Sequence, residues 1–332
     1  MYSKFGQFID GKWQQAEKKE TYDVINPATE EVIGKASKAS SVDVQKALKS
    51  AEKGLQVWKN TTPWKRSYII RKIADLMRQK QDVLAKWLTL EVGKPLAEGI
   101  GETGGAADIF EWNAEETKRI YGQTVESRFP DTRVHVYYQP VGVVAALVPW
   151  NFPLSMIGRS LSCSFATGNS TIIKTAELTP LSATVFAKAI QNAGVPEGLI
   201  NIICGYGNEA GSYLVSHEDV NHVVFTGSVA TGKKIIHACA DKAIPAVVEL
   251  GGKSAGIVYP DADLNEVLES ARSGIFSVAG QICTAMSRLV VHKSIKDELV
   301  DKLVDMSKSL KIGPGIELSL IHISEPTRRH LI

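Results

Sequence analysis

The sequence predicts an α/β fold built on a doubly wound parallel sheet, and three observations support this prediction. After residue 140, short apolar runs alternate with helix-like segments, which is the pattern of βαβ units. The first run, Val141–Val148, is apolar throughout, as expected of a parallel strand buried on both faces. Glycine-containing and polar motifs follow the ends of these runs, where ligands gather in such sheets.

Residues 1–123 precede the alternation and are predicted to be mostly helical. Phe8–Trp13 predicts a hairpin, because Asp10-Gly11 lies at its centre. Helices are predicted where apolar residues recur with a period of 3.6, and the Gly93-Lys94-Pro95 segment ends the second of them. Residues 124–140 contain an alternating stretch that predicts a strand. The predicted elements are helices at Ser41–Trp58, Pro63–Glu91 and Leu96–Ile120 and a strand at Arg133–Gln139.

Residues 141–249 form the predicted core of the domain, with a sheet of the Rossmann-like type. Each strand is expected to end at the same edge of the sheet, because parallel strands joined by crossover helices share one direction. Beyond Val141–Val148, strands are predicted at Thr171–Lys174, Leu199–Ile203, His222–Phe225 and Ala246–Glu249, with helices at Leu154–Ala166, Leu181–Asn192, Glu209–Ser216 and Val229–Ala240.

Two glycine patterns imitate nucleotide-binding motifs. Gly99–Gly104 matches G-x-G-x-x-G, but a helical run precedes it where the dinucleotide motif needs a strand, so we expect these glycines to allow close helix packing. Gly227–Lys233 matches most of the P-loop pattern, but Lys234 stands where Ser or Thr would bind magnesium. The sequence therefore argues against a P-loop ATPase.

A thiol and a carboxylate mark the region after the core. Glu249 ends an apolar strand, and Cys283 follows a predicted strand at 255–259 and a predicted helix at 263–278. A thiol can attack a carbonyl carbon, and a carboxylate can activate the water that releases the acyl group. The alternatives are a solvated glutamate and a cysteine that serves as a small apolar side chain. Cys283 differs from that second alternative because Gly280, Gln281 and Thr284 surround it.

The other cysteines give no sign of metal or redox chemistry. Cys163, Cys204 and Cys239 lie in apolar or helical surroundings and are predicted to be inert. No pair has the C-x-x-C spacing of a zinc site or redox dithiol, so no metal site is expected.

Five motifs, in order and at similar spacings, resemble those of the aldehyde dehydrogenase superfamily. The resemblance extends from about Phe8 to about Glu317. It implies oxidation of an aldehyde to a carboxylic acid with NAD(P)+, through a cysteine thiohemiacetal and a thioester. The motifs are P-W-N-F-P (Pro149–Pro153), I-I-K-T-A-E (Ile172–Glu177), F-T-G-S (Phe225–Ser228), E-L-G-G-K-S (Glu249–Ser254) and A-G-Q-I-C-T-A (Ala279–Ala285).

The resemblance also assigns roles to residues at the matching positions. Cys283 would be the nucleophile, Glu249 the base that activates water, and the Asn151 amide a donor to the oxyanion. Lys174 and Glu177 would hold the adenosine ribose, and a carboxylate there favours NAD over NADP; the alternative is a surface ion pair. Ser228 would also cap a helix. The implied cofactor-binding residues are Pro149, Trp150, Lys174, Glu177, Gly207, Phe225, Gly227, Ser228, Leu250 and Gly251.

The substrate is predicted from Arg159, eight residues after Asn151. Dehydrogenases that act on succinate semialdehyde carry an arginine at the matching place, where it binds the substrate carboxylate, and a guanidinium suits that role. The run Glu111–Gly122 also resembles that branch, but Ser277 stands where those enzymes have a second arginine. The resemblance therefore favours an aldehyde with a distal carboxylate, and a solvated arginine is the alternative.

The end of the chain departs from the family. The E-I-F-G-P-V motif, whose glutamate holds the nicotinamide ribose, does not occur, so residues 250–317 are expected to be an incomplete catalytic domain. Leu318–Arg328 resembles a translated sequencing adaptor, and residues 318–332 are predicted to be a non-native tail. A C-terminally truncated chain is therefore expected. The alternatives are an inactive cofactor-binding fragment and an acylating, coenzyme A-dependent dehydrogenase, against which Glu249 argues.

Composition limits the other possibilities. The 332 residues are 44% hydrophobic and 22% charged with a net charge of +2, so neither nucleic acid nor an anionic membrane is an expected partner. No apolar run is long enough to span a membrane, and the N-terminus lacks a signal-peptide pattern. A cytoplasmic protein is expected. By resemblance, residues 124–140 would be an oligomerisation arm of a full-length homodimer or homotetramer.

Overall fold

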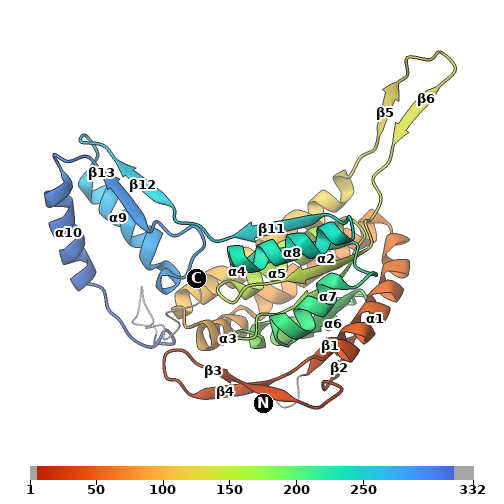
Figure 1. The fold of residues 1–332 in the computed structure, drawn as a ribbon, viewed down its shortest axis with the longest axis horizontal. Coiled ribbons are helices and arrows are strands. Elements are labelled where there is room, and N and C mark those ends of the chain that lie inside the picture. Colours follow the sequence, from red (N-terminus) through yellow and green to blue (C-terminus); the bar gives the residue numbers. More distant parts are fainter. Residues whose placement is uncertain (1–5, 318–332) are drawn as a thin grey trace.

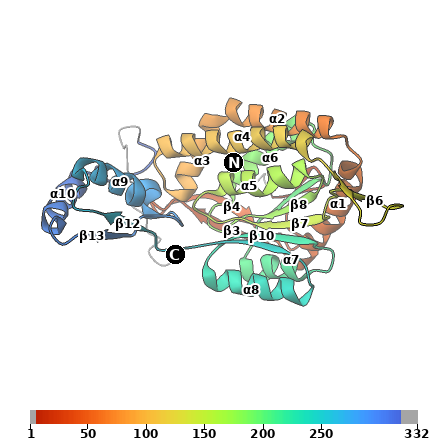
Figure 2. The same cartoon turned by 90° about the horizontal axis from the view of Figure 1, so that it is seen from above.

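The computed structural model describes residues 6–317 and shows a central seven-stranded sheet between two layers of helices (Figures 1 and 2). Strands β11, β10, β7, β8 and β9 are parallel neighbours, and β1 adds to β9 in the antiparallel sense. This confirms the predicted α/β class. The strands are β1 (Gln7–Ile9), β2 (Lys12–Gln14), β7 (Val143–Leu147), β8 (Ser170–Lys174), β9 (Ile200–Ile203), β10 (His222–Gly227) and β11 (Ala246–Leu250).

The chain winds outward from β7 in two directions. It first adds β8 and β9 on one side of β7, and then β10 and β11 on the other. The switch point therefore lies between β7 and β10, and crevices at such points bind ligands in open α/β sheets. Near their carboxyl ends the five parallel strands form one row of paired residues, Val248, Phe225, Leu147, Lys174 and Ile203.

Helices cover both faces of this sheet (Figure 2). Strand β8 shows why, because every one of its residues is buried: Ile172 joins one core cluster and Ile173 the other. One face carries α5 (Pro153–Ala166) and α6 (Leu181–Ala193), with α2 (Pro63–Gln79), α3 (Gln81–Val92) and α4 (Leu96–Glu116) outside them; the other carries α1 (Ser41–Lys59), α7 (Ser212–Ser216) and α8 (Val229–Asp241).

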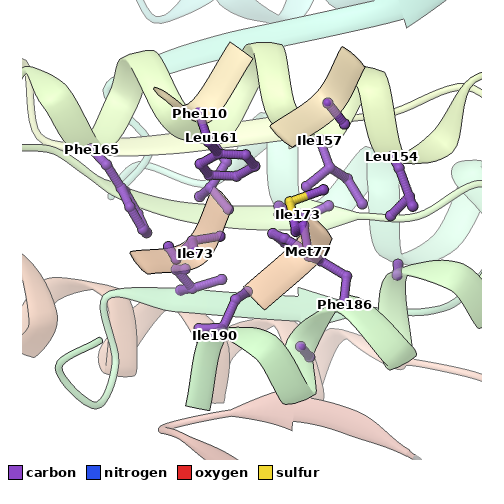
Figure 3. Packing of buried hydrophobic residues seen from close by; sticks show 14 of the residues in the cluster. Ile73, Met77, Phe110, Leu154, Ile157, Leu161, Phe165, Ile173, Phe186 and Ile190 are labelled. Carbon is purple, nitrogen blue, oxygen red and sulfur yellow. The ribbon is translucent and has the colours of Figure 1, made fainter. Parts of the chain in front are cut away.

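The larger core cluster lies between the sheet and the helices α2 to α6 (Figure 3). Phe110 and Phe186 pack with ring centroids 5.7 Å apart, and Trp58 packs against Phe165 while its Nε1 donates to the Phe165 carbonyl at 2.9 Å. Burying each such side chain contributes about 1.5–3 kcal/mol. The sheet that carries the site residues is thus packed firmly against these helices.

Two helix predictions need correction. The predicted helix Pro63–Glu91 is divided into α2 and α3 at Lys80, whose N–H returns to the Leu76 and Met77 carbonyls. Apolar periodicity continues across this break because both pieces pack against α4, so the pattern could not show it. The predicted helix Glu209–Ser216 is a π-type turn, Gly207–Gly211, followed by α7.

The glycine pattern at Gly99–Gly104 lies inside α4, as predicted, and follows no strand. Close packing explains only part of it. A Cβ on Gly99 would lie 2.8 Å from the Ala85 carbonyl oxygen of α3, and one on Gly104 would lie 3.3 Å from the Gln81 side chain, whereas one on Gly101 would meet nothing within 4 Å. The packing interpretation therefore holds at Gly99 and is wrong at Gly101.

Two antiparallel hairpins lie outside the central sheet, and the first of them packs against the body through Val24 and Ala36. The pair β3 (Thr21–Ile25) and β4 (Val32–Ser37) was not predicted beyond its Asn26-Pro27 turn. The pair β5 (Gln123–Glu126) and β6 (Arg133–Val136) extends away from the sheet, with every residue of both strands exposed (Figure 1). Its second strand confirms the first part of the predicted strand Arg133–Gln139.

A C-terminal lobe, residues 251–317, lies beside the body and is joined to it after β11 (Figure 1). The parallel strands β12 (Ala255–Val258) and β13 (Arg288–Val291) form its sheet, beside α9 (Leu264–Phe276) and α10 (Lys296–Lys308). Strand β12 and helix α9 agree to within a few residues with the strand predicted at 255–259 and the helix predicted at 263–278. The predicted non-native tail, residues 318–332, lies outside the described residues. Within residues 6–317, no helix is long and apolar enough to cross a membrane.

Candidate active site

The first and third motifs, P-W-N-F-P and F-T-G-S, meet at the switch point of the sheet. Pro149–Pro153 follows β7 directly, and the F-T-G-S motif forms the end of β10 and the start of α8. Phe225 is buried, and a Cβ on Gly227 would lie 2.5 Å from the Phe225 ring, so this position must be glycine for the strand end to pack as it does. The two motifs therefore lie on adjacent strands, where the sheet topology predicts a ligand crevice.

Glu249 lies next to the same strand end. It pairs with Thr226 in the β10–β11 ladder, and Leu250 pairs with Gly227. Val248 and Leu250 pack into the cluster on the α8 side, so strand alternation directs the exposed Glu249 side chain to the opposite face, on which α5 lies. Glu249 therefore lies at the carboxyl edge of the sheet, on the side of the helix that follows Asn151.

Cys283 lies in the C-terminal lobe just beyond the short helix η4 (Ser277–Gly280). Three successive residues before it have left-handed backbones, with φ of 52° at Val278, 55° at Ala279 and 76° at Gly280. For valine, a β-branched residue, this conformation is strained, and such strain persists only where surrounding contacts hold it. Cys283 is an exposed residue. Its backbone carbonyl oxygen lies 3.7 Å from the position that a Cβ atom on Gly252 would occupy.

Asn151 links the body to this turn. Its side-chain Nδ2 donates to the carbonyl oxygen of Gln281 at 2.7 Å, two residues before Cys283. One amide hydrogen of Asn151 is used in that bond, and the second remains for another acceptor. The structure thus brings Asn151, the turn that carries Cys283 and the strand end that carries Glu249 to one region.

The helices that begin at the carboxyl edge of the sheet differ in which groups accept from their first N–H groups. At two of them, buried carboxylates already do so: Glu102 accepts from the N–H groups of Leu154 and Ser155 on α5, and Glu91 accepts from those of Leu181 and Ser182 on α6. At α8 the cap is the neutral hydroxyl of Ser228, and its first turn has no acidic residue. Among these three helices, α8 is the one able to receive an anionic ligand such as a pyrophosphate.

Lys174 and Glu177 lie at the end of β8. Lys174 is buried, and its Nζ lies 2.9 Å from the Glu177 carboxylate, which is partly exposed. The ion pair orients Glu177 and leaves part of its carboxylate accessible. Two glycines near this edge have open space around them: a Cβ on Gly207 or on Gly251 would meet nothing within 4 Å. Packing inside the described chain therefore does not require glycine at these two positions. Close approach of a ligand to the backbone would require it.

Arg159 is the predicted site residue least connected to the others. It is exposed on α5 and makes no ion pair within residues 6–317. Its carbonyl oxygen accepts from the Sγ of Cys163 at 2.9 Å. Within residues 6–317, no hydrogen bond or ion pair joins its guanidinium to Asn151 or Cys283, so Arg159 stands apart from the residues that the structure brings together.

The remaining cysteines are less reactive by environment. Cys204 and Cys239 are buried, and burial raises the pKa of the Cys204 thiol to about 11. Cys163 is exposed on α5, yet desolvation at the helix surface raises its thiol pKa too. In the described part of the chain, no cluster of His, Cys, Asp and Glu could hold a metal ion.

Three charged residues near the site were not singled out from the sequence. Lys94 was seen only as part of a helix-breaking turn, yet its side chain is fully buried and contacts Glu102 and the Asn151 carbonyl oxygen. Glu98 accepts from the Val278 N–H at 2.9 Å. A signal was present, because Glu98 and Glu102 are spaced i, i+4 in a helix otherwise rich in Gly and Ala, and so share one face.

Comparison with known proteins agrees with this fold. A family model described as the aldehyde dehydrogenase family matches residues 13–322, a range that ends inside the segment predicted to be a tail. The chain therefore belongs to the aldehyde dehydrogenase family. It is 40% identical over 310 residues to glutarate-semialdehyde dehydrogenase of Pseudomonas aeruginosa and 39% identical over 309 residues to the NADP(+) succinate-semialdehyde dehydrogenase of Escherichia coli, covering 93% of this chain in both cases.

Solved structures give the same result. A betaine aldehyde dehydrogenase from Staphylococcus aureus, in complex with NAD+ and with a modified cysteine, matches 96% of this chain with a TM-score of 0.94 and 34% identity. An NADP-dependent enzyme of Escherichia coli matches 95% with a TM-score of 0.93 and 38% identity. The chain spans 64% of the length of both curated relatives and 64% and 66% of these two structures.

Proposed function

We propose that the protein oxidises an aldehyde to a carboxylic acid with a nicotinamide dinucleotide, with Cys283 as nucleophile. The observation that carries the proposal is the 2.7 Å hydrogen bond from Asn151 to Gln281, which joins the switch point of the sheet to the turn bearing the thiol. In this proposal the body, residues 1–249, binds the cofactor, and residues 250–317 supply the nucleophile. Membership in the family and the order of the motifs support it.

The residues divide the chemistry among them as follows. The Cys283 thiolate adds to the carbonyl carbon and forms a C–S bond, and the oxygen becomes an oxyanion. The remaining Asn151 amide hydrogen and the Cys283 backbone N–H stabilise that oxyanion, and loss of one such donor typically raises the barrier by about 2.7–4 kcal/mol. When bound, the nicotinamide supplies the hydride acceptor that turns the thiohemiacetal into a thioester. Glu249 then takes a proton from water, which attacks the thioester and releases the acid and the thiolate.

The cofactor is best accommodated along the edge between β10 and β9. The free N-terminus of α8 suits a pyrophosphate, and the open backbone at Gly207 and Gly251 allows close approach. Glu177, oriented by Lys174, is suited to accept from a ribose 2′-hydroxyl and would repel a 2′-phosphate. We therefore propose NAD as the preferred cofactor. Pro149, Trp150, Phe225 and Leu250 would form the walls of this site.

The substrate proposed is an aldehyde with a carboxylate at its other end. Two relatives are named for glutarate and succinate semialdehydes, which have this form. Arg159 supports the proposal because its guanidinium is exposed on α5 and unpaired within residues 6–317. Arg159→Gln should raise KM for succinate semialdehyde by at least about tenfold and leave KM for butanal, a neutral aldehyde of equal length, unchanged. An equal change for both aldehydes would contradict a carboxylate-binding role.

The exposed hairpin β5–β6 is proposed to serve in self-association. Its strands bury none of their residues against the body, and Tyr137 and Tyr138 beside it are 76% and 65% exposed. A two-stranded ribbon is marginally stable alone, so contact with a second copy would give it support. Sedimentation of the chain lacking residues 123–139 tests this: a monomer is expected, and an unchanged assembly would contradict it.

NAD binding and turnover test the proposed function directly. Quenching of tryptophan fluorescence by NAD should saturate, and Ser228→Asp, which places a carboxylate at the α8 N-terminus, should weaken binding of the dinucleotide. Addition of succinate semialdehyde should then produce NADH, and Cys283→Ser should abolish NADH formation while it retains NAD binding. Binding without turnover in the wild-type chain would support an inactive cofactor-binding fragment, and NADH formation by Cys283→Ser would contradict the assigned nucleophile.

A further inference from the structure

A buried charged group lies directly behind Asn151. Lys94, in the turn between α3 and α4, has a fully buried side chain. Its Nζ contacts the Glu102 carboxylate, donates to the Asn151 carbonyl oxygen at 2.8 Å and lies 4.1 Å from the centre of the Phe152 ring. An ammonium in this position fixes the backbone of Asn151, because breaking any of these contacts would leave a buried charge unsatisfied.

The carboxylate partner of Lys94 continues the connection to the next helix. One oxygen of Glu102 faces Lys94, and the other accepts from the N–H groups of Leu154 and Ser155 at 3.0 and 3.1 Å. Asn151 is therefore held on both sides, by Lys94 at its carbonyl and by the anchored start of α5 after it. From this fixed base its side chain reaches the Gln281 carbonyl.

Glu98 makes a second connection to the same turn. It lies one helical turn before Glu102 on the same face of α4, and its carboxylate accepts from the Val278 N–H at 2.9 Å. Val278 is the first of the three left-handed residues before Gln281. One face of α4 thus contacts both segments of the site, the Asn151 loop through Glu102 and Lys94 and the cysteine turn through Glu98.

We propose that Lys94, Glu98 and Glu102 are positioning residues that hold the turn 278–281, with its left-handed Val278 and Ala279, in place and so set the reactivity of Cys283. None of the three contacts the thiol in the structure, and each acts through Asn151 or Val278. The catalytic meaning of this arrangement rests on the proposed function, but the arrangement itself can be tested on the thiol alone.

Glu91 provides a matched control. It is as buried as Glu102 and likewise accepts from two backbone N–H groups at a helix N-terminus, those of Leu181 and Ser182 on α6. The N–H groups that Glu91 binds begin α6, whereas those that Glu102 binds begin α5, directly after Asn151. A role limited to folding would make substitutions at Glu91 and Glu102 equivalent, whereas positioning of the cysteine turn would separate them.

The experiment measures alkylation of the full chain by iodoacetamide, with Cys283 and Cys163 quantified separately by peptide mass spectrometry. Both cysteines are exposed, so Cys163 serves as the internal reference. Glu98→Ala removes the acceptor of the Val278 N–H while the Val278 side chain stays packed in the core. The Cys283 to Cys163 rate ratio should rise about threefold or more, together with faster hydrogen exchange at residues 277–283. Glu98→Gln, whose amide oxygen can still accept from Val278, should restore both values, and Glu91→Gln should leave both unchanged.

A paired substitution covers the buried residues. Lys94→Met with Glu102→Gln removes both charges together, so no lone buried charge remains. It should raise the same ratio through loss of the donor to Asn151, even if Glu98→Ala does not fold. An unchanged ratio in the paired variant and in folded Glu98→Ala would overturn the proposal, as would an equal rise in Glu91→Gln. Failure of the wild-type chain to bind NAD would instead overturn the proposed function, because the alkylation comparison needs no cofactor.

Discussion

The body and the C-terminal lobe differ in how far they bury the strands of their sheets. In the body, β7 and β8 are buried along their whole length between two helical layers. In the lobe, β12 and β13 alternate between covered and exposed residues, with Ile257 67% and Val290 57% exposed. The difference shows that burial is concentrated in the body, whereas Cys283, the proposed nucleophile, belongs to the less buried lobe.

The seam between these two regions depends on a few directed contacts. Asn151 donates to Gln281, Glu98 accepts from Val278, and the Leu96 N–H donates to the Gly315 carbonyl at 2.8 Å. Gly315 must be glycine, because a Cβ there would lie 2.4 Å from the Lys94 carbonyl oxygen. The start of α4 therefore contacts the lobe at two places, Gly315 and Val278. The geometry of the site thus depends on how the body holds these two segments of the lobe.

The largest expected difference between the regions is in core substitutions. Phe165→Ala removes a ring packed against Trp58 and should lower the free energy of unfolding by about 3–5 kcal/mol. Val290→Ala, at an exposed position of the lobe, should change it by less than about 0.5 kcal/mol. Urea denaturation followed by tryptophan fluorescence measures both. Equal losses would show that the lobe is packed as tightly as the body.

Helix caps give a smaller test with matched chemistry. Ser228 accepts from the Thr231 N–H at the start of α8, and Asp263 accepts from the Asn265 N–H at the start of α9. Each change to alanine should weaken its helix by about 1 kcal/mol. Ser228→Ala, in the body, should lower the free energy of global unfolding. Asp263→Ala, in the lobe, should leave that free energy unchanged and only speed hydrogen exchange in α9. A global effect of Asp263→Ala would contradict separate stabilities.

The smallest expected effect is a pH dependence of stability caused by Glu98, which lies where the body meets the lobe. Burial raises the pKa of the Glu98 carboxyl above its ordinary value, so the folded state binds this proton more tightly than the unfolded state. Glu98 should therefore lower the stability as pH rises from the ordinary carboxyl pKa, about 4.3, through the raised value. Glu98→Gln removes that decline. Denaturation midpoints across this range, compared with wild type, measure it, and an unchanged slope in Glu98→Gln would exclude Glu98 as its source.

The parallel core could be predicted because its strands are short, apolar and separated by clear helices. Val141–Val148 signals burial directly, and the structure buries every residue of β7. Ala246–Glu249 is also a strand of the sheet, as predicted, but it forms β11 at the edge, where its residues are only partly covered or exposed. The motifs follow strand ends, so their gathering at one edge also follows from the sequence. The order of the strands does not, because β1 joins β9 through contacts almost two hundred residues apart, such as Phe8 with Ile202.

The charged residues behind the site show why the rest was missed. Sequence patterns treat Lys94 and Glu102 as solvated, since charged side chains are seldom fully buried. Only the fold reveals that α4 lies against α5 and leaves them paired in the interior. The division of Pro63–Glu91 at Lys80 was missed for a similar reason, since tertiary packing against α4 continues the apolar pattern across the break.

Trapping of the acyl group on Cys283 tests the central claim most directly. The Glu249→Gln chain, mixed with NAD and succinate semialdehyde and quenched in acid, should carry the acyl group on the peptide that contains Cys283. NADH should form in one stoichiometric burst without further turnover, because hydrolysis lacks its base. A burst with the acyl group on Cys283 is the predicted result. An acyl group on Cys163 or on another residue, or a Glu249→Gln chain that turns over at the wild-type rate, would contradict the assigned site.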